Sequence, residues 1–140
     1  MNSCIFCQIV EGTAESSIVY KDRLVTAFMD IQPINPGHLL VVPNAHAAYL
    51  SELVPETGAQ MFKVAQFLAQ AIRDSSIHCE GINLFLADGE AAMQEVFHVH
   101  LHVIPRNSGD GFGVTFPQRY FSRPSRAELD TAAELIKNAI

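Results

Sequence analysis

Three histidines alternate with three aliphatic residues at positions 98 to 103, in the order His-Val-His-Leu-His-Val. Successive side chains of a β-strand point to opposite faces, so this spacing predicts a strand over 97–104 with all three imidazoles on one face. The aliphatics would anchor the strand in a core, whereas each imidazole needs partners for two ring nitrogens and can change charge near neutral pH. We therefore expect a functional face; the alternative is a polar face whose histidines are only solvated or metal-bound.

The size and charge of the chain limit the kinds of partner it can have. A chain of 140 residues is long enough for one domain with a single core. Its 49% hydrophobic and 17% charged residues favour a compact globule over disorder. The net charge of -6 leaves no broad basic surface, which argues against a long nucleic acid as partner. A small phosphorylated ligand remains compatible, because it needs only a few local donors.

Neither the first residues nor any later segment indicates export or membrane insertion. The opening stretch lacks a basic leader with an apolar core, and no later apolar run is long enough to cross a bilayer. Cys4 and Cys7 form a C-x-x-C pair and Cys79 stands alone, which is unlike the disulfide framework of a secreted protein. We expect a cytoplasmic protein with no membrane partner.

The hydrophobic pattern predicts a mixture of short strands and two helices. Residues 56–75 carry apolar side chains at helical spacing, which favours an amphipathic helix. Ser125 and Glu128 have the spacing of a capping box and precede a second helical pattern at the C-terminus. Besides 97–104, the expected strands cover 17–20, 24–29, 38–42 and 82–86, separated by turn residues.

The motifs of this chain resemble those of the histidine-triad (HIT) family of nucleotide hydrolases and transferases, in particular its zinc-binding bacterial-type members. His98–Val103 matches the signature of the family. Cys4–Cys7, Phe28–Ile31, and Pro36–Pro43 with the following His46 resemble its N-terminal pattern, in the family order. The match departs from the family in one stretch. Where many members carry Asn and Gly before the triad, this chain has Ala87 and Met93.

The resemblance implies an architecture and an assembly. It predicts an α+β, HIT-like fold, with an antiparallel sheet of about five strands, a long helix and a C-terminal helix. It also implies a single HIT domain over residues 1–140, with a core over 4–106 and a C-terminal loop and helix over 107–140. Members of the family usually form homodimers with joined sheets, so we expect a two-fold homodimer.

The resemblance also implies a reaction and the residues that carry it. We expect a phosphohydrolase or nucleotidyl transferase that acts at the α-phosphate of a purine nucleotide derivative, such as a dinucleoside polyphosphate or a nucleoside phosphoramidate, through a nucleotidyl-histidine. His100 would be the nucleophile, and His102 would neutralise charge on the transferring group or hydrogen-bond to it. His38 would orient His100. Gln94, which can donate and accept, would contact the phosphate.

A second set of residues is implied to bind the nucleoside. Asp30 would accept hydrogen bonds from the ribose hydroxyls, and Ile31 would pack against the sugar and base. Ile5, Ile9 and Phe28 are further candidates for apolar contacts with the base, or for the core. The full set of implied substrate-binding residues is Phe6, Asp30, Ile31, Gln94, Val96, His100 and His102.

The third implied set is a metal site made of Cys4, Cys7, His46 and His98. Two thiolates and two imidazoles suit tetrahedral Zn²⁺, and the resemblance implies a structural ion in this set and no catalytic organic cofactor. Zinc would tie the N-terminal segment to the strand that carries His100. The alternative is a C-x-x-C dithiol without metal.

Two other functions remain open at the level of sequence. The first is a nucleotide-binding regulatory module with weak turnover, which the Ala87 departure supports because alanine offers no donor to a phosphate. The second is a zinc-stabilised interaction protein. A covalent nucleotide on His100 would favour the enzyme, and tight binding without such a label would favour the module.

Overall fold

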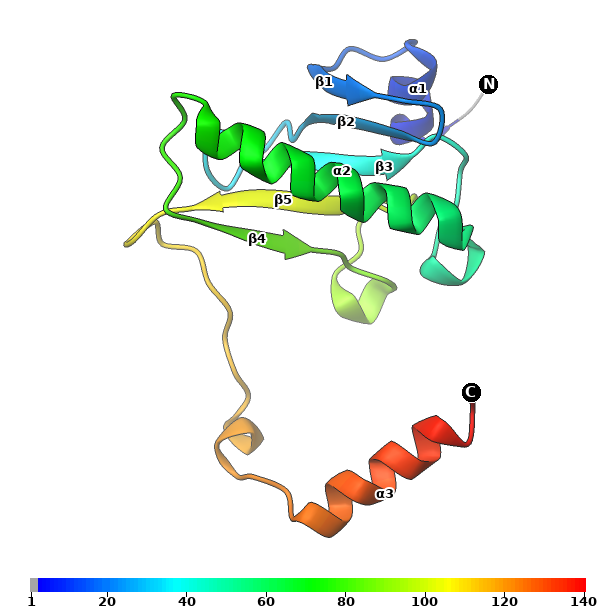
Figure 1. Cartoon of the computed structure of the whole chain (residues 1–140), viewed down its shortest axis with the longest axis vertical. Coiled ribbons are helices and arrows are strands. Elements are labelled where there is room, and N and C mark those ends of the chain that lie inside the picture. Colours follow the sequence, from blue (N-terminus) through cyan, green and yellow to red (C-terminus); the bar gives the residue numbers. More distant parts are fainter. Residues whose placement is uncertain (1–2) are drawn as a thin grey trace. The chain divides into compact units, whose positions relative to one another are not determined.

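The computed structural model of the chain describes residues 3–140. A five-stranded sheet, antiparallel throughout, forms the centre of the fold, with the strand order β1-β2-β3-β5-β4 (Figure 1). The α+β class and the antiparallel sheet expected from the sequence are confirmed. The strands are β1 (Ile18–Lys21), β2 (Val25–Met29), β3 (Leu39–Pro43), β4 (Gly81–Phe85) and β5 (Leu101–Arg106).

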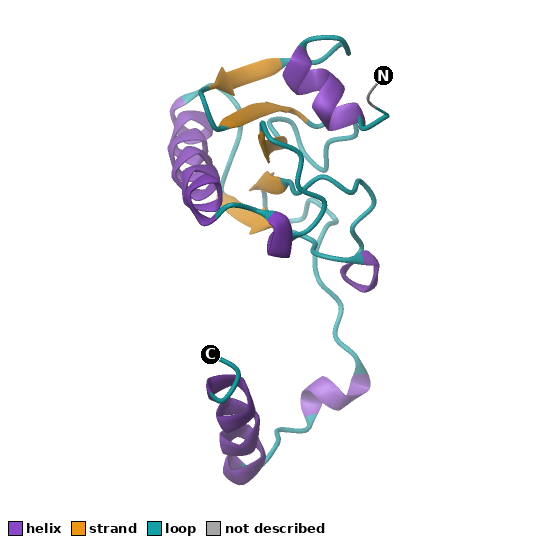
Figure 2. Cartoon of the chain, turned by 90° about the vertical axis from the view of Figure 1, so that its right-hand side faces the viewer, coloured by secondary structure: helices purple, strands orange, loops and turns teal. Residues whose placement is uncertain are grey.

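The long helix α2 (Pro55–Asp74) covers one face of the sheet and confirms the helix expected over 56–75. Proline suits its first turn, where the missing N–H would have no helical partner. Figure 2 shows this helix on one side of the strands and the short N-terminal helix on the other. The main core lies between α2 and the sheet and includes Met61, Val64, Leu68, Val25, Val41, Val99, Leu101 and Val103.

The opposite face of the sheet is partly covered by α1 (Ile5–Glu11), which the sequence pattern did not predict. Phe6 and Ile9 of this helix pack against Phe28 of β2, in a second cluster that also contains Leu40 and Val42. A helix of two turns has little intrinsic stability in water, so it depends on this packing rather than on local propensity. Such dependence explains why sequence periodicity alone misses it.

The strand that carries part of the histidine motif begins later than expected. We predicted a strand over 97–104, but β5 spans Leu101–Arg106, so His98 and His100 precede it. Continuing the register of Val41 opposite Leu101 would bring Pro43 opposite Val99, and proline has no N–H to donate. The N–H of Val99 bonds instead to the Ala47 carbonyl, at 2.8 Å. The alternation of faces nevertheless persists, because Val99, Leu101 and Val103 all lie in the main core.

The C-terminal residues form a unit of their own. The chain divides into a unit up to Asp110 and a second unit over Gly111–Ile140. The expected C-terminal helix is present as α3 (Arg126–Lys137), and both hydrogen bonds of the Ser125–Glu128 capping box are formed. A single domain over 1–140 stays a prediction.

Within residues 3–140, no helix has both the length and the apolar character needed to cross a membrane. The cytoplasmic location expected from the sequence stays a prediction.

A tight turn at residues 35–37 immediately precedes β3. Gly37 has φ of +94°, in the left-handed region that side chains disfavour, and the N–H of His38 bonds back to the Asn35 carbonyl. The turn is also crowded, since a Cβ on Gly37 would lie 3.2 Å from side-chain atoms of Ile77 and Pro105. Both constraints fix where His38 enters the sheet.

We predict that Gly37→Ala lowers the free energy of unfolding by at least about 1 kcal/mol, because the new Cβ meets both a disfavoured φ and close neighbours. Urea denaturation measures the change. Gly81→Ala in β4 is the matched control, because a Cβ there has no atom within 4 Å. Equal stabilities of the Gly37→Ala variant and the unchanged protein would contradict this account of the turn.

Candidate active site

A cavity of about 800 Å³ opens on the face of the sheet that carries α1. His38, His100 and His102 all line it, together with Asp30. The sequence motifs that lie far apart in the chain therefore meet in one place. An apolar part of the wall contains four of the candidate base-contact residues, Ile5, Phe6, Ile9 and Phe28, and Ile31 and Val96 line the same cavity.

His100 is held by the backbone rather than by His38. Its side chain is buried, and Nδ1 lies 2.8 Å from the carbonyl oxygen of His98. Since a carbonyl only accepts, Nδ1 carries the proton, and Nε2 keeps a lone pair in the neutral ring. The ring of Phe6 packs edge-on against that of His100, with centroids 5.2 Å apart. The expectation that His38 orients His100 is wrong, because the hydrogen bond of His38 goes to His102.

A chain of hydrogen bonds sets the tautomers of His38 and His102. The backbone N–H of Ile34 donates to Nδ1 of His38 at 3.0 Å, so the proton of neutral His38 is on Nε2. That Nε2 lies 2.9 Å from Nδ1 of His102, which therefore accepts. A neutral His102 then carries its proton on Nε2. The chain thus leaves His102 with an N–H donor on its far nitrogen.

Burial keeps both of these imidazoles neutral at physiological pH. Burial, together with the neighbouring rings of His100 and His38, lowers the pKa of His102 to about 4, while Asp30 acts in the opposite direction. Burial also lowers the pKa of His38, against the attraction of Asp30. The site therefore offers imidazole N–H groups rather than imidazolium charges.

Asp30 lies at the end of β2 beside these histidines. One oxygen, Oδ1, accepts from the Gln32 N–H at 2.8 Å. The other, Oδ2, lies 3.4 Å from Nε2 of His38 and 3.9 Å from Nδ1 of His102. The carboxylate is thus oriented by the loop after β2 and still has acceptor capacity toward the cavity.

Gln94 does not line the cavity. Its side-chain amide is buried and bonded to the backbone: Nε2 donates to the carbonyls of Ala48 and Val96, and Oε1 accepts from the Gly89 N–H. Ala87 is also buried away from the cavity wall. The structure brings the three histidines and Asp30 together, but not Gln94.

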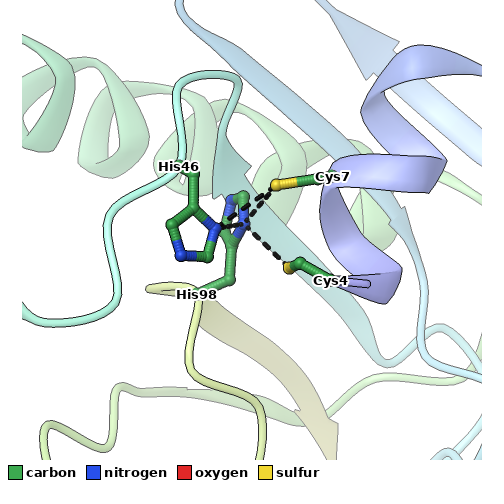
Figure 3. A group of neighbouring side chains, drawn as sticks. All are labelled: Cys4, Cys7, His46 and His98. Carbon is green, nitrogen blue, oxygen red and sulfur yellow. Dashed lines mark hydrogen bonds between the residues drawn. The ribbon is translucent and has the colours of Figure 1, made fainter. Parts of the chain in front are cut away.

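The four residues expected to bind metal converge from three parts of the chain (Figure 3). Their potential ligand atoms, from Cys4, Cys7, His46 and His98, all lie within 4.8 Å of one another. Nδ1 of His98 lies 3.4 Å from Sγ of Cys4, 3.5 Å from Sγ of Cys7 and 3.2 Å from Nδ1 of His46. Sγ of Cys7 lies 3.3 Å from Nδ1 of His46.

These distances fit a tetrahedral metal. Zinc bonds of about 2.0 Å to nitrogen and about 2.3 Å to sulfur separate the ligand atoms of a tetrahedron by roughly 3.3–3.8 Å. The tautomer of His98 also fits, because Nε2 lies 2.8 Å from the Pro43 carbonyl and must donate to it. Its Nδ1 lone pair is then directed into the cluster, oriented by a carbonyl as metal-bound imidazoles usually are.

Sequence reasoning missed a polar network behind His38. Nδ2 of Asn35 donates to the Pro105 carbonyl and to Oδ2 of Asp110, both at 2.8 Å. Arg106 holds the same carboxylate with two of its nitrogens, at 2.8 and 2.9 Å. The network secures the turn next to Ile34, whose N–H orients His38. Only the Asn-Pro-Gly turn residues gave a sequence signal for it.

The sequence also gave no role to several residues of the cavity wall. Glu15, Ser16 and Ser17 contribute to it from the segment before β1, and Met93 and Glu95 from the segment before the triad. Met93 has φ of +71°, at the position where many family members carry glycine. That departure was the one signal for this part of the wall.

Residues 11–109 match the model of the HIT domain family. The chain belongs to the HIT family. Its fold is similar to the crystal structure of a HIT family protein from Bacillus anthracis, with a TM-score of 0.89 and 38% identity over 99% of this chain and 98% of that one. The family model covers the whole sheet of this HIT protein, and the similar crystal structure extends over nearly the whole chain.

Two further similarities bear on its chemistry. A Zn-bound histidine triad family protein from Mycobacterium smegmatis is 40% identical, with a TM-score of 0.75 over 99% of this chain and 98% of that one. The adenosine 5'-monophosphoramidase hnt1 of Schizosaccharomyces pombe is 39% identical over 82% of this chain and 84% of its own length. The first carries the metal and the second the activity that its name states.

We predict that stability falls as the pH is lowered from about 6.5 to about 4. The unfolded state binds a proton on His102 near pH 6.5, whereas the folded state resists protonation until about pH 4, so acid favours unfolding over this interval. The contribution of His102 amounts to at most about 3 kcal/mol. Urea denaturation at several pH values measures it, and His102→Gln should flatten the slope. An unchanged slope in that variant would contradict the assignment to His102.

Proposed function

We propose that this HIT protein is a nucleotide phosphohydrolase or nucleotidyl transferase that acts at the α-phosphate of a purine nucleotide derivative. The observation that supports it most is the tautomer of His100, whose Nδ1 is tied to the His98 carbonyl while Nε2 keeps its lone pair beside the cavity. An imidazole lone pair is a nucleophile toward phosphorus. The activity named for the hnt1 relative belongs to the same class.

The proposed reaction has two displacements at the same phosphorus atom. In the first, the Nε2 lone pair of His100 bonds to the α-phosphorus, and the leaving group departs with the electrons of its bond and takes up one proton. The ring is then a nucleotidyl-imidazolium, and its Nδ1–H still donates to the His98 carbonyl. In the second, water attacks phosphorus, the P–N bond returns its electrons to Nε2, and one proton is released. The sum is addition of one water across the bond to the leaving group.

His102 is proposed to stabilise the transferring phosphate as a neutral donor. A phosphate oxygen needs N–H groups, and the far nitrogen of His102 supplies one because its near nitrogen accepts from His38. His38 then acts through His102 and not through the nucleophile. Asp30, with acceptor capacity left, suits the ribose hydroxyls. The apolar wall that includes Phe6 suits a purine base.

Gln94 is proposed to act through the backbone. Its three hydrogen bonds connect the segments that carry Ala48, Gly89 and Val96, and Val96 lines the cavity. Losing these bonds would loosen the wall beside the triad. This role differs from the direct contact with phosphate expected from the resemblance.

The proposal includes a structural Zn²⁺ held by Cys4, Cys7, His46 and His98, supported by the spacing of these atoms and by the Zn-bound relative. Bound there, the metal would supply cross-linking of α1 to the segment before β5, without taking part in the reaction. Its ligand His98 also provides the carbonyl that holds His100.

A homodimer is also part of the proposal. Strand β4 lies at an edge of the sheet, and the side chains of its residues Leu84 and Phe85 are partly exposed. An unpaired edge with apolar side chains is suited to continuing the sheet into a second copy. The acidic net charge continues to argue against long nucleic acids as partners.

We predict that His100→Ala removes both turnover and covalent labelling. The change deletes the attacking nitrogen, so the rate of hydrolysis of an adenosine 5'-phosphoramidate should fall by at least about 10³-fold. Intact-mass analysis of acid-quenched protein detects the added nucleotidyl group. His78→Ala, at an exposed histidine outside the cavity, should keep both. Retained turnover and labelling in the His100→Ala variant would refute the proposed reaction.

We predict about one zinc per chain in protein purified without chelators, as expected for a four-ligand site. Elemental analysis should find the metal lost from the Cys4→Ser/Cys7→Ser double variant and kept in Cys79→Ser, the matched control. Because metal binding is linked to folding, chelation should lower the Tm of the metal-loaded protein. Protein that contains no zinc and cannot be loaded with it would remove the metal from the proposal and leave the reaction at His100 untouched.

A nucleotide-binding module with weak turnover is the second candidate. The observation that favours it is the lack of a donor at Ala87 and the full engagement of Gln94 with the backbone, which leaves fewer groups for phosphate. Tight nucleotide binding in calorimetry, with neither labelling nor turnover, would decide for the module.

A further inference from the structure

The charges around the cavity are unusual for a site that takes a phosphorylated ligand. Three carboxylates line it, those of Glu15, Asp30 and Glu95, and no Lys or Arg from residues 3–140 does. His38 and His102 add no positive charge near neutral pH, because burial lowers their pKa values. The described wall is therefore acidic.

Two of these carboxylates, those of Glu15 and Glu95, are exposed and form no hydrogen bond or ion pair within residues 3–140. Asp30 is engaged by the Gln32 N–H and lies close to His38. Glu95 differs from Glu15 in its place in the chain, because it lies three residues before His98, whereas Glu15 lies in the segment before β1. An unpaired carboxylate at the wall is available to a charge on the ligand.

The backbone beside Glu95 is nevertheless fixed. Gln94, its neighbour, is buried and bonded to the Ala48 and Val96 carbonyls and to the Gly89 N–H. Val96, on the other side, also lines the cavity. The backbone here is already held by hydrogen bonds, so an exposed side chain on it can bind a ligand group with little further loss of backbone conformational entropy.

The part of the ligand that meets Glu95 follows from the rest of the wall. In the proposed function, Asp30 and the apolar residues around Phe6 bind the nucleoside. His100, which is buried and lines the same cavity, would attack the phosphorus through its Nε2. Glu95 comes from a different segment, just before the triad. We therefore assign the segment that carries Glu95 to the leaving group of the substrate.

We propose that Glu95 makes this protein selective for nucleotide derivatives whose leaving group carries a positive charge, such as the phosphoramidate of a diamine. The inference rests on the proposed function and adds the substrate class to it. The bond broken is the P–N bond, and the amine leaves with its electrons and one proton while its remote ammonium stays beside Glu95. A dinucleoside polyphosphate would instead bring further negative charges to an acidic wall.

The test compares two adenosine 5'-phosphoramidates of nearly equal length, one of 1,5-diaminopentane and one of n-pentylamine. They differ in a remote ammonium. The unchanged protein should prefer the cationic compound in kcat/KM by roughly fivefold, the factor that corresponds to about 1 kcal/mol of charge attraction. The preference should shrink with added salt. Glu95→Gln should bring the ratio close to one, and Glu95→Lys should reverse it.

Glu90→Gln is the matched control, since it removes the same charge from a nearby exposed residue that does not line the cavity. It should keep the ratio of the unchanged protein. A ratio near one in the unchanged protein, or a ratio unaffected by Glu95→Gln, overturns the inference even when both compounds are hydrolysed. Absence of hydrolysis counts against the proposed reaction alone, and the ratio of the two Kd values then decides on Glu95.

Discussion

The burial of Val99, Leu101 and Val103 beneath α2 is the constraint on which the site depends. These side chains occupy the main core, so the backbone between them has little freedom, and the imidazoles of His98, His100 and His102 must point to the other face. The geometry does not need a regular strand throughout. Only the last of the three histidines lies in β5, yet alternation holds because the core fixes every second residue.

His98 connects the two chemical centres of the fold. Its Nδ1 faces the cysteine–histidine cluster, its Nε2 donates to the Pro43 carbonyl, and its own carbonyl accepts from Nδ1 of His100. One residue therefore sets both the direction of a lone pair into the proposed metal site and the tautomer of the neighbouring imidazole. Any change that rotates the peptide of His98 alters both, whereas a change confined to its ring alters the cluster first.

Sequence patterns predicted most of the elements and the composition of the site, but not its internal hydrogen bonds. The periodicity of α2 and the capping box at Ser125 are local signals, and the corresponding helices are present. The helix α1 was missed because its stability comes from packing against β2 and β3. The cysteine–histidine set was recognisable from spacing and resemblance, and the structure brings its four members together.

The partner of His38 was predicted wrongly for a related reason. A motif gives the residue types in a site, but which of two imidazoles accepts a hydrogen bond depends on the loop at Ile34 and on the register of β3 against β5. The register sets Leu40, the second residue of β3 and two residues after His38, opposite His102. The hydrogen bonds of the Gln94 side chain to the backbone could not be predicted from the sequence either, because their partners lie up to 46 residues away.

In the proposed function, neutral imidazoles explain how an acidic cavity without Lys or Arg in its described wall receives a phosphate. An imidazolium would attract the anion more strongly, but burial makes that charge costly, and a protonated His100 would lose the lone pair that attacks. With His38 and His102 held neutral, the site contributes directed N–H dipoles and keeps its nucleophile. Binding of the proposed phosphate then depends on the orientation of these N–H groups rather than on net charge. Of the carboxylates at the wall, Asp30 is oriented by the Gln32 N–H, whereas Glu95 is the one proposed to discriminate among the groups attached to that phosphate.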